Sequence, residues 1–360
     1  MELVGEHGTP TLFLSAGRLR ENYRTLRSAL PGVDLYYAVK ANPLPEVVAI
    51  LQQEGSFFDI ASCGEIEVVR SRGIDGARCI HTNPIKRDSD IRAALDFGID
   101  TFVVDNPSEL AKFGPYRDAA RLLIRLSIQN PQCLVNLSHK FGVRPDRAME
   151  LIREARDRGL AVEGIAFHCG SQNENVLKYI EALDYCRDIC RMAAVEGCAL
   201  NTIDIGGGFP VDYVNPVAPV AQFCRPINEY LERYFATYRV IAEPGRAVCG
   251  SALTLATRVI GTSIREGIRW YYIDDGLYGS FSGKVFDHAD YPMYVPRSGQ
   301  RHTSTIAGPT CDSIDVPYEN IALPELKVGD VLLFGTMGAY TNATATRFNA
   351  LPPAKVVTVD

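Results

Sequence analysis

The chain has 360 residues, which suits one large domain or two domains of medium size. It carries 43 acidic and 37 basic side chains, and this negative balance argues against a nucleic-acid-binding surface. No apolar run approaches the roughly 20 residues that span a membrane, and the N-terminus lacks the pattern of a signal peptide. The ten cysteines have no C-x-x-C spacing and do not cluster with the six histidines, so we expect reduced thiols, a cytoplasmic protein and no zinc site.

From residue 20 to about residue 245, short apolar runs alternate with longer stretches of helical period. Eight of these runs are predicted to be strands: 34–39, 57–61, 78–82, 101–104, 121–127, 162–168, 202–205 and 238–242. Eight strand–helix units fit a (β/α)₈ barrel, whose usual size is about 250 residues. A doubly wound sheet is the alternative.

After about residue 250 the pattern changes to apolar segments separated by Gly and Pro, with few helical stretches. The segments RWYYIDD, HTSTIAG, DVLLFG and AKVVTVD are of this kind, which indicates a β domain. The segment TPTLFLS near the N-terminus would add a strand to it. We therefore expect a barrel over 16–248 and a β domain built from 1–15 and 249–360.

The predicted barrel strands end in polar residues. In this fold, catalytic residues lie at the C-terminal ends of the strands. The side chains at these ends are Lys40, Asp59, Arg125, His168, the run Gly206–Gly208 and the segment Glu243-Pro244-Gly245-Arg246. One polar strand end usually has a structural reason, such as a snorkelling lysine. Six such ends around one barrel mouth indicate a functional site.

The glycine run after the seventh predicted strand is a candidate phosphate site. Because Gly206, Gly207 and Gly208 lack side chains, their N–H groups can surround an anion. The loops after barrel strands seven and eight are the usual phosphate site of this fold, and Arg246 supplies a bidentate phosphate partner. Taken alone, the run is equally compatible with an ordinary tight turn.

A phosphorylated aldehyde would connect this phosphate site with Lys40. Pyridoxal phosphate needs a lysine for its Schiff base, a phosphate site and a partner for its ring nitrogen. Glu243 is the candidate for that nitrogen, because a carboxylate keeps the ring protonated and so favours loss of CO₂. His168 is the candidate for the ring face, and its alternative is a hydrogen-bonded core histidine.

Eight motifs occur in an order that is specific to one family: YYAVKANP, FDIASCGEIE, HCGSQ, DIGGGFP, EPGR, DDGLYGSF, GPTCDSID and GAYT. In these motifs the chain resembles the fold type III pyridoxal-phosphate decarboxylases of basic amino acids, which include ornithine, lysine and diaminopimelate decarboxylases. The resemblance covers nearly the whole chain. It implies a (β/α)₈ barrel with a β domain, and a head-to-tail homodimer with active sites at the subunit interface.

The resemblance also implies roles for single residues. Lys40 matches the Schiff-base lysine, His168 the ring-stacking histidine and Glu243 the partner of the ring nitrogen. The other residues expected around the cofactor are Asp59, Arg125, Ser171, Gly207, Gly208, Gly245, Arg246 and Tyr340.

Further matches fall in the second half of the chain. Cys311 resembles the cysteine that returns a proton to Cα after CO₂ leaves, and its alternative is a small buried hydrophobe. Lys140 and Asp315 match a pair that links the two subunits, and the region of Gly338 is expected at the same interface.

The segment CDSID points to the substrate. Asp312 and Asp287 resemble the two carboxylates that bind the distal amino group of ornithine or lysine, and Phe348 resembles the aromatic residue at the end of that pocket. A buried cation needs such partners. Diaminopimelate decarboxylases usually have a glutamate after the cysteine.

Four alternatives stay open at this point. Ornithine and lysine differ by one methylene, which a pocket separates by only about 1–3 kcal/mol, so dual specificity is expected. A modified diamino acid or diaminopimelate-like compound of secondary metabolism is a second substrate class. A racemase and a non-catalytic regulatory homologue are the other options, and the presence of Lys40, Glu243 and Cys311 argues against the homologue.

Overall fold

The computed structural model describes residues 2–360, and the chain divides into two compact units. The larger unit comprises 20–210 and 217–248. The other comprises the chain up to Leu19, together with 211–216 and 249–360. Within residues 2–360, no helix combines the length and the apolar character that crossing a membrane requires.

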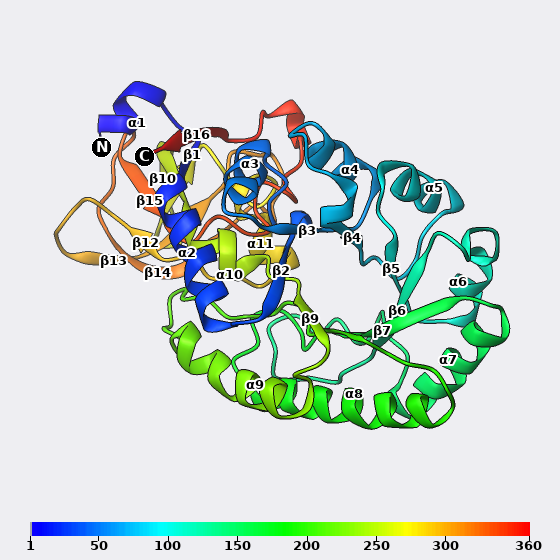
Figure 1. Ribbon diagram of the computed structural model, residues 1–360. Coiled ribbons are helices and arrows are strands. Elements are labelled where there is room, and N and C mark those ends of the chain that lie inside the picture. Colours follow the sequence, from blue (N-terminus) through cyan, green and yellow to red (C-terminus); the bar gives the residue numbers. More distant parts are fainter. Residues whose placement is uncertain (1) are drawn as a thin grey trace. The chain divides into compact units, whose positions relative to one another are not determined.

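The larger unit is a closed barrel of parallel strands (Figure 1). Its strands are β2 (Val33–Ala38), β3 (Phe57–Ile60), β4 (Cys79–His81), β5 (Thr101–Val104), β6 (Arg121–Leu126), β7 (Ala161–Phe167), β8 (Thr202–Asp204) and β9 (Arg239–Ala242). They follow chain order around the barrel, and β9 pairs with β2 to close it. All eight predicted strands are confirmed, and the doubly wound alternative is wrong because the sheet closes.

Helices lie on the outside of the barrel strands (Figure 1). They are α2 (Ala16–Ala29), α3 (Pro45–Gln53), α4 (Cys63–Arg70), α5 (Asp88–Phe97), α6 (Pro107–Lys112), α7 (Ala148–Asp157), α8 (Leu177–Val195) and α9 (Val220–Tyr234). Helix α7 illustrates why they pack there. Its buried residues include Ala148, Leu151, Ile152 and Ala155, which share one helical face at spacings of three and four.

An apolar layer fills the barrel interior. It consists of Tyr36, Ile80, Val103, Leu123, Ala166 and Ile241, each at most 3% exposed, with Phe57 packed against it. These residues come from six strands, which is how side chains fill the interior of such barrels. The layer therefore closes the barrel below the strand ends.

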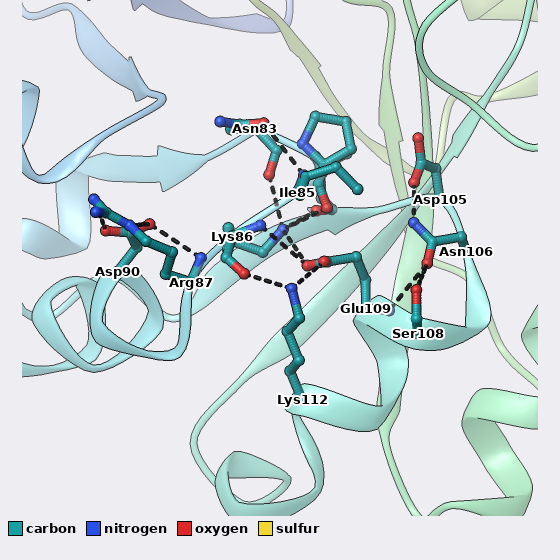
Figure 2. A network of polar contacts seen from close by, with 12 residues as sticks. Asn83, Ile85, Lys86, Arg87, Asp90, Asp105, Asn106, Ser108, Glu109 and Lys112 are labelled. Carbon is teal, nitrogen blue, oxygen red and sulfur yellow. Dashed lines mark hydrogen bonds and ion pairs between the residues drawn. The ribbon is translucent and has the colours of Figure 1, made fainter.

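A buried lysine ties the loop after β4 to strand β5 (Figure 2). Lys86 Nζ donates to the carbonyl oxygens of Asn83 at 2.8 Å, Pro84 at 3.1 Å and Val103 at 2.6 Å. Glu109 Oε2 lies 3.9 Å from the same nitrogen. Burial lowers the pKa of Lys86 to about 7, and the Glu109 carboxylate opposes this shift. The loop that carries the C-terminal end of β4 is thus anchored by internal hydrogen bonds.

The other unit is a β-rich domain with one mixed sheet. Its strands are β1 (Thr11–Ser15), β10 (Leu253–Arg265), β11 (Ile268–Ile273), β12 (Met293–Tyr294), β13 (Arg301–Ala307), β14 (Tyr318–Pro324), β15 (Val331–Phe334) and β16 (Lys355–Val359). Short helices α1 (Glu2–His7), α10 (Arg246–Cys249) and α11 (Gly283–Phe286) complete the chain. Strand β1 pairs antiparallel with β10 and parallel with β16, so segments from both chain ends lie side by side (Figure 1).

Candidate active site

A ring of polar side chains lies two residues beyond the apolar layer of the barrel. Alternate residues of a strand share one face, so this spacing turns the side chains inward again. The residues at these positions are Asp59, Thr82, Asp105, Arg125, His168 and Glu243. Lys40 and Arg125 both act electrostatically on His168, and Lys40 and Asp59 both act on Glu243. The predicted barrel residues are therefore brought together at one mouth.

Lys40 lies just outside its strand. Strand β2 ends at Ala38, and Val39–Ala41 form a short 3₁₀ turn, in which Asn42 N–H donates to Val39 O at 3.1 Å. The predicted strand 34–39 therefore ends one residue earlier, and Lys40 lies in this turn rather than directly at the strand end. The side chain is 39% exposed, so its amine is accessible at the barrel mouth.

Asp59 is the ion-pair partner of Lys40. Its carboxylate is fully buried, with Oδ2 paired to Lys40 Nζ and Oδ1 accepting a hydrogen bond from Thr82 Oγ1. Both oxygens are held, so the orientation of the carboxylate is fixed. Sequence reasoning missed Thr82, although it stands at the end of the predicted strand 78–82 and the strand-end rule would have found it.

A second acid near Lys40 was also missed. Glu65 lies in the first turn of α4, and its Oε2 accepts a hydrogen bond from Ala61 N–H at 2.7 Å. Burial raises the pKa of Glu65 to about 7, and the positive charge of Lys40 opposes the shift. Its signal in the sequence is the Ser62–Glu65 spacing that begins a helix, which indicates capping rather than catalysis.

His168 follows β7 and is neutral. Burial lowers the pKa of its imidazole well below the usual value, and the charges of Arg125 and Lys40 lower it further. Nδ1 accepts a hydrogen bond from Gly170 N–H at 3.0 Å, so the proton of the neutral ring is on Nε2. A neutral, oriented imidazole suits the predicted position against an aromatic ring.

The glycine run forms a tight backbone cradle. Gly206 and Gly208 have positive φ angles of 67° and 102°. A Cβ on Gly207 would lie 2.5 Å from Glu243 O, and one on Gly208 would lie 2.2 Å from Gly170 O. Only glycine fits at these positions.

Polar groups beside the cradle suit an anion. Arg246, which begins α10 directly after Gly245, is 4% exposed and its Nη2 donates to Ser171 Oγ at 2.8 Å. Ser171 N–H donates to Val135 O at 3.0 Å, which holds this loop in place. A buried guanidinium, a hydroxyl and a side-chain-free backbone fit a phosphate group.

Glu243 follows β9 and is buried. Burial raises the pKa of its carboxyl well above the usual value, and the charges of Asp204 and Asp59 raise it further, whereas Lys40 lowers it. A buried carboxylate needs a cationic partner. The site therefore fits a group that brings a protonated nitrogen to Glu243.

In the β unit, the predicted Cys311, Asp312 and Phe348 form a surface cluster. Cys311 N–H donates to Asn349 Oδ1 at 2.9 Å. Tyr278 connects the other two, because its hydroxyl donates to Asp312 Oδ2 and its ring stacks on Phe348 at 4.5 Å between centroids. The hydrogen bond from Tyr278 lowers the pKa of Asp312. Sequence reasoning missed Tyr278, although it is part of the motif DDGLYGSF.

Two other predicted site residues also belong to the β unit. Asp287 follows α11, is 7% exposed, and its N–H donates to Gly283 O at 3.0 Å. Tyr340 has a positive φ of 54°, and its carbonyl accepts a hydrogen bond from Thr344 Oγ1 at 3.0 Å. Their roles toward the substrate and the phosphate stay predictions.

The residues expected at a subunit interface have these surroundings. Lys140 Nζ lies 4.8 Å from the ring centroid of Phe141. Asp315 is 2% exposed and accepts hydrogen bonds from Leu277 N–H at 2.7 Å and Thr310 Oγ1 at 2.7 Å. Gly338 N–H donates to Gly250 O at 2.8 Å, and both residues belong to the β unit. The link between subunits stays a prediction.

Comparison with known proteins gives the family. Residues 16–250 match the model of the pyridoxal-dependent decarboxylases, pyridoxal-binding domain. The chain belongs to the pyridoxal-dependent decarboxylases. This decarboxylase is 42% identical over 342 residues to the lysine/ornithine decarboxylase of Selenomonas ruminantium, covering 95% of this chain and 87% of that protein. It is a pyridoxal-phosphate-dependent carboxy-lyase, as the sequence predicted.

Solved structures agree with this assignment. The lysine/ornithine decarboxylase of Vibrio vulnificus in complex with putrescine matches with a TM-score of 0.95 and 47% identity, over 100% of this chain and 96% of that one. The chain is also 36% identical over 365 residues to an antizyme inhibitor 2 from Xenopus laevis, covering 94% of this chain and 78% of that protein. The predicted (β/α)₈ barrel with a β domain is confirmed.

Proposed function

We propose that this decarboxylase converts L-ornithine and L-lysine to the corresponding diamines and CO₂. The proposal rests on the similarity to two lysine/ornithine decarboxylases and on the Asp312 carboxylate, which Tyr278 orients in the β unit. A carboxylate held by a hydrogen bond can receive the distal ammonium of either substrate. Asp287 is proposed as the second carboxylate, and Phe348 as the apolar wall at the side-chain end.

Pyridoxal phosphate, when bound, supplies an electron sink for the bond pair left at Cα. Lys40 is the residue proposed to hold its aldehyde carbon, and Asp59 orients the Lys40 amine. Ser171, Arg246 and the glycine cradle are proposed to hold its phosphate. Glu243 is proposed to hold a proton at its ring nitrogen, since a buried carboxylate there is stabilised by a cation.

The reaction needs one proton for each CO₂ released. The bond from Cα to the carboxylate carbon breaks, its electron pair stays at Cα, and a proton must be added there. Cys311 is the proposed donor. Its thiol is exposed on the β unit, and such a donor works best where water is excluded.

We further propose a homodimer in which Cys311 and Asp312 complete the barrel mouth of the second copy. Exposed apolar and reactive groups on one loop support a partner surface, since Ile314, three residues after Cys311, is 60% exposed. Lys140, Asp315 and the region of Gly338 are the proposed interface residues. The ten cysteines are all free thiols, which supports a reducing cytoplasmic location.

Two alternatives to this function remain distinct. A modified diamino acid or diaminopimelate-like substrate would undergo the same decarboxylation, but its side chain would need other contacts at the end of the pocket. A non-catalytic homologue would bind the cofactor without releasing CO₂, and an antizyme inhibitor 2 is among the relatives. The presence of Lys40, Glu243 and Cys311 in this chain supports catalysis, and a decarboxylase releases CO₂ whereas a racemase does not.

The test is CO₂ release from the holoenzyme with L-ornithine, L-lysine, L-arginine and meso-diaminopimelate side by side. We expect turnover of ornithine and lysine. In the Asp312→Asn variant the KM for both should rise about tenfold or more, because a charge-assisted hydrogen bond is lost. Turnover of diaminopimelate alone would contradict the proposed substrate. Bound cofactor without turnover of any of the four would contradict the proposed function.

A further inference from the structure

Two buried carboxyl groups lie side by side at the barrel mouth. Asp204 is the last residue of β8, and Glu243 directly follows its neighbour β9. The two strands are in register, and Glu243 N–H donates to Gly206 O at 2.8 Å. Asp204 is fully buried and Glu243 is 9% exposed. The family resemblance gave Glu243 a role, but sequence reasoning gave none to Asp204.

Asp204 has an incomplete set of donors. Its Oδ1 accepts a hydrogen bond from Gly206 N–H at 2.8 Å. Among residues 2–360, no N–H or hydroxyl group donates to its buried Oδ2. The Glu243 carboxyl is the acidic neighbour of Asp204, because Glu243 directly follows the strand that pairs with β8, and each carboxyl acts on the other electrostatically. Two ionised carboxylates cannot form a hydrogen bond, so a proton between them is the arrangement that satisfies Oδ2.

The charges around the pair lead to the same conclusion. Asp59 faces both carboxyls, Lys40 faces Glu243 and Arg125 faces Asp204. His168 adds no charge to the mouth, because its Nδ1 accepts a hydrogen bond from Gly170 N–H and burial and these cations lower its pKa. Glu65 and Asp105 are further acids of this mouth and Arg246 is a further cation, so five acids face three cations. A proton on the carboxyl pair reduces this excess of negative charge.

We propose that Asp204 and Glu243 share one proton in the cofactor-free barrel, and that Asp204 is a positioning residue that keeps this proton on Glu243 for the ring nitrogen of the cofactor. Glu243 then gives up the proton without uptake from solvent. The pair changes from one negative charge to two, and the nitrogen gains one positive charge. Burial raises the pKa of both carboxyls, that of Asp204 to about 6. This inference rests on the proposed role of Glu243.

The variants Asp204→Asn and Glu243→Gln test the shared proton. Each replaces one carboxyl by an amide of the same shape that can donate to the remaining carboxylate, so neither needs the proton. The control is Asp275→Asn in the β unit. Asp275 is also buried, with a pKa raised to about 6 by burial and one oxygen without a donor among residues 2–360.

The first readout is the infrared band of a protonated carboxyl group in the cofactor-free, full-length chain near neutral pH, with the wild-type reference and every variant carrying Glu65→Gln, because burial raises the pKa of Glu65 to about 7. We expect this band in the wild type and in Asp275→Asn, and its loss in Asp204→Asn and in Glu243→Gln. Because either variant alone must remove it, a folding failure of one leaves the other decisive. A wild type without the band, or a band that survives both substitutions, overturns the proposal.

The second readout is the number of protons taken up when pyridoxal phosphate binds, from calorimetry in buffers of different ionisation enthalpy. Asp204→Asn should take up about one more proton per cofactor than the wild type, since Glu243 has none to give. Equal uptake overturns the proposal. Ornithine turnover by the same wild-type preparation tests the function separately. Turnover without the shared band contradicts only this inference, and the band without turnover contradicts only the proposed function.

Discussion

The barrel mouth holds its reactive groups in buried positions, whereas the segment around Cys311 in the β unit holds them at the surface. In the barrel, Asp59 is fully buried and Glu243 is 9% exposed, and strand ends fix their positions. In the β unit, Cys311 is exposed, Phe348 is 39% exposed, and side-chain contacts through Tyr278 hold the cluster. Burial perturbs pKa values strongly in the first region, whereas a hydrogen bond perturbs them in the second.

Because of this difference, the barrel part of the proposed active site is preorganised and the part in the β unit is not. Buried charges in the barrel are stabilised by one another, so their geometry exists before a ligand binds. An exposed thiol and an exposed aromatic ring gain a dry environment only when something covers them. We infer that the barrel supplies the cofactor chemistry, and that the segment around Cys311 would become competent in the proposed dimer.

The largest effect is expected at Lys40. Lys40→Ala removes the amine that is proposed to hold the cofactor, and CO₂ release should fall by roughly 10⁴-fold. Some cofactor should stay bound through the phosphate site. Steady-state turnover and cofactor absorbance measure both effects, and Lys178→Ala on the outer helix α8 is the matched control. Substantial turnover in Lys40→Ala would refute the assignment.

A smaller effect is expected on the loop side. Cys311→Ala removes the proposed proton donor, and turnover should fall by roughly 10²-fold while the product shifts from diamine toward aldehyde. Chromatographic analysis of both products measures this shift. Cys198→Ala, a partly buried cysteine beyond α8, should leave the ratio unchanged. An unaltered ratio in Cys311→Ala would count against its role.

Loss of the hydrogen bond from Thr82 to Asp59 should lower activity less than either of these two substitutions. Thr82→Val keeps the shape but removes the donor to Asp59, and kcat should fall roughly tenfold, the equivalent of about 1.4 kcal/mol. Thr82→Ser keeps the hydroxyl and should retain most activity. The kcat of both variants and the pH dependence of the cofactor absorbance are the measurements. Equal kcat in Val and Ser variants would show that the hydroxyl does not position Asp59.

The buried Lys86 should make the stability of the barrel depend on pH. With a folded pKa of about 7 against an ordinary value of 10.5, Lys86 loses its proton before the unfolded chain does, so the unfolded state binds more protons between these two pH values. The free energy of unfolding should therefore rise with pH by up to about 1.4 kcal/mol per pH unit from this group.

Lys86→Met should remove that contribution, and urea unfolding at a series of alkaline pH values measures the slope. Turnover should change little, because Lys86 contacts the loop carbonyls rather than the mouth. An unchanged slope would mean that the three carbonyl groups keep Lys86 protonated in the folded chain.

Much of the fold was readable from the sequence because buried parallel strands leave uninterrupted apolar runs. The eight predicted strands match β2 to β9 within one residue at each end. The 3₁₀ turn that carries Lys40 was missed, because the apolar run continues through Val39 and composition does not mark where pairing stops. The cofactor residues were identified by the resemblance of their motifs to a known family. Their convergence at one mouth was predicted because catalytic residues of this fold lie at the C-terminal ends of the strands.

The missed residues share a physical reason. Thr82, Asp204 and Tyr278 act on other side chains rather than on a ligand, so their places in a strand end or a motif do not reveal what they do. Each depends on a neighbour distant in sequence, such as Asp59 for Thr82 or Asp312 for Tyr278. Those pairings become visible only when the chain is folded.

The decisive experiment mixes two variants of low activity, Lys40→Ala and Cys311→Ala, under conditions that let subunits exchange. If each barrel mouth is completed by the Cys311 loop of a second copy, half of the randomly paired dimers carry one intact site. Ornithine decarboxylation should then return to about a quarter of the wild-type rate. No recovery after demonstrated exchange would contradict the division of the active site between two copies.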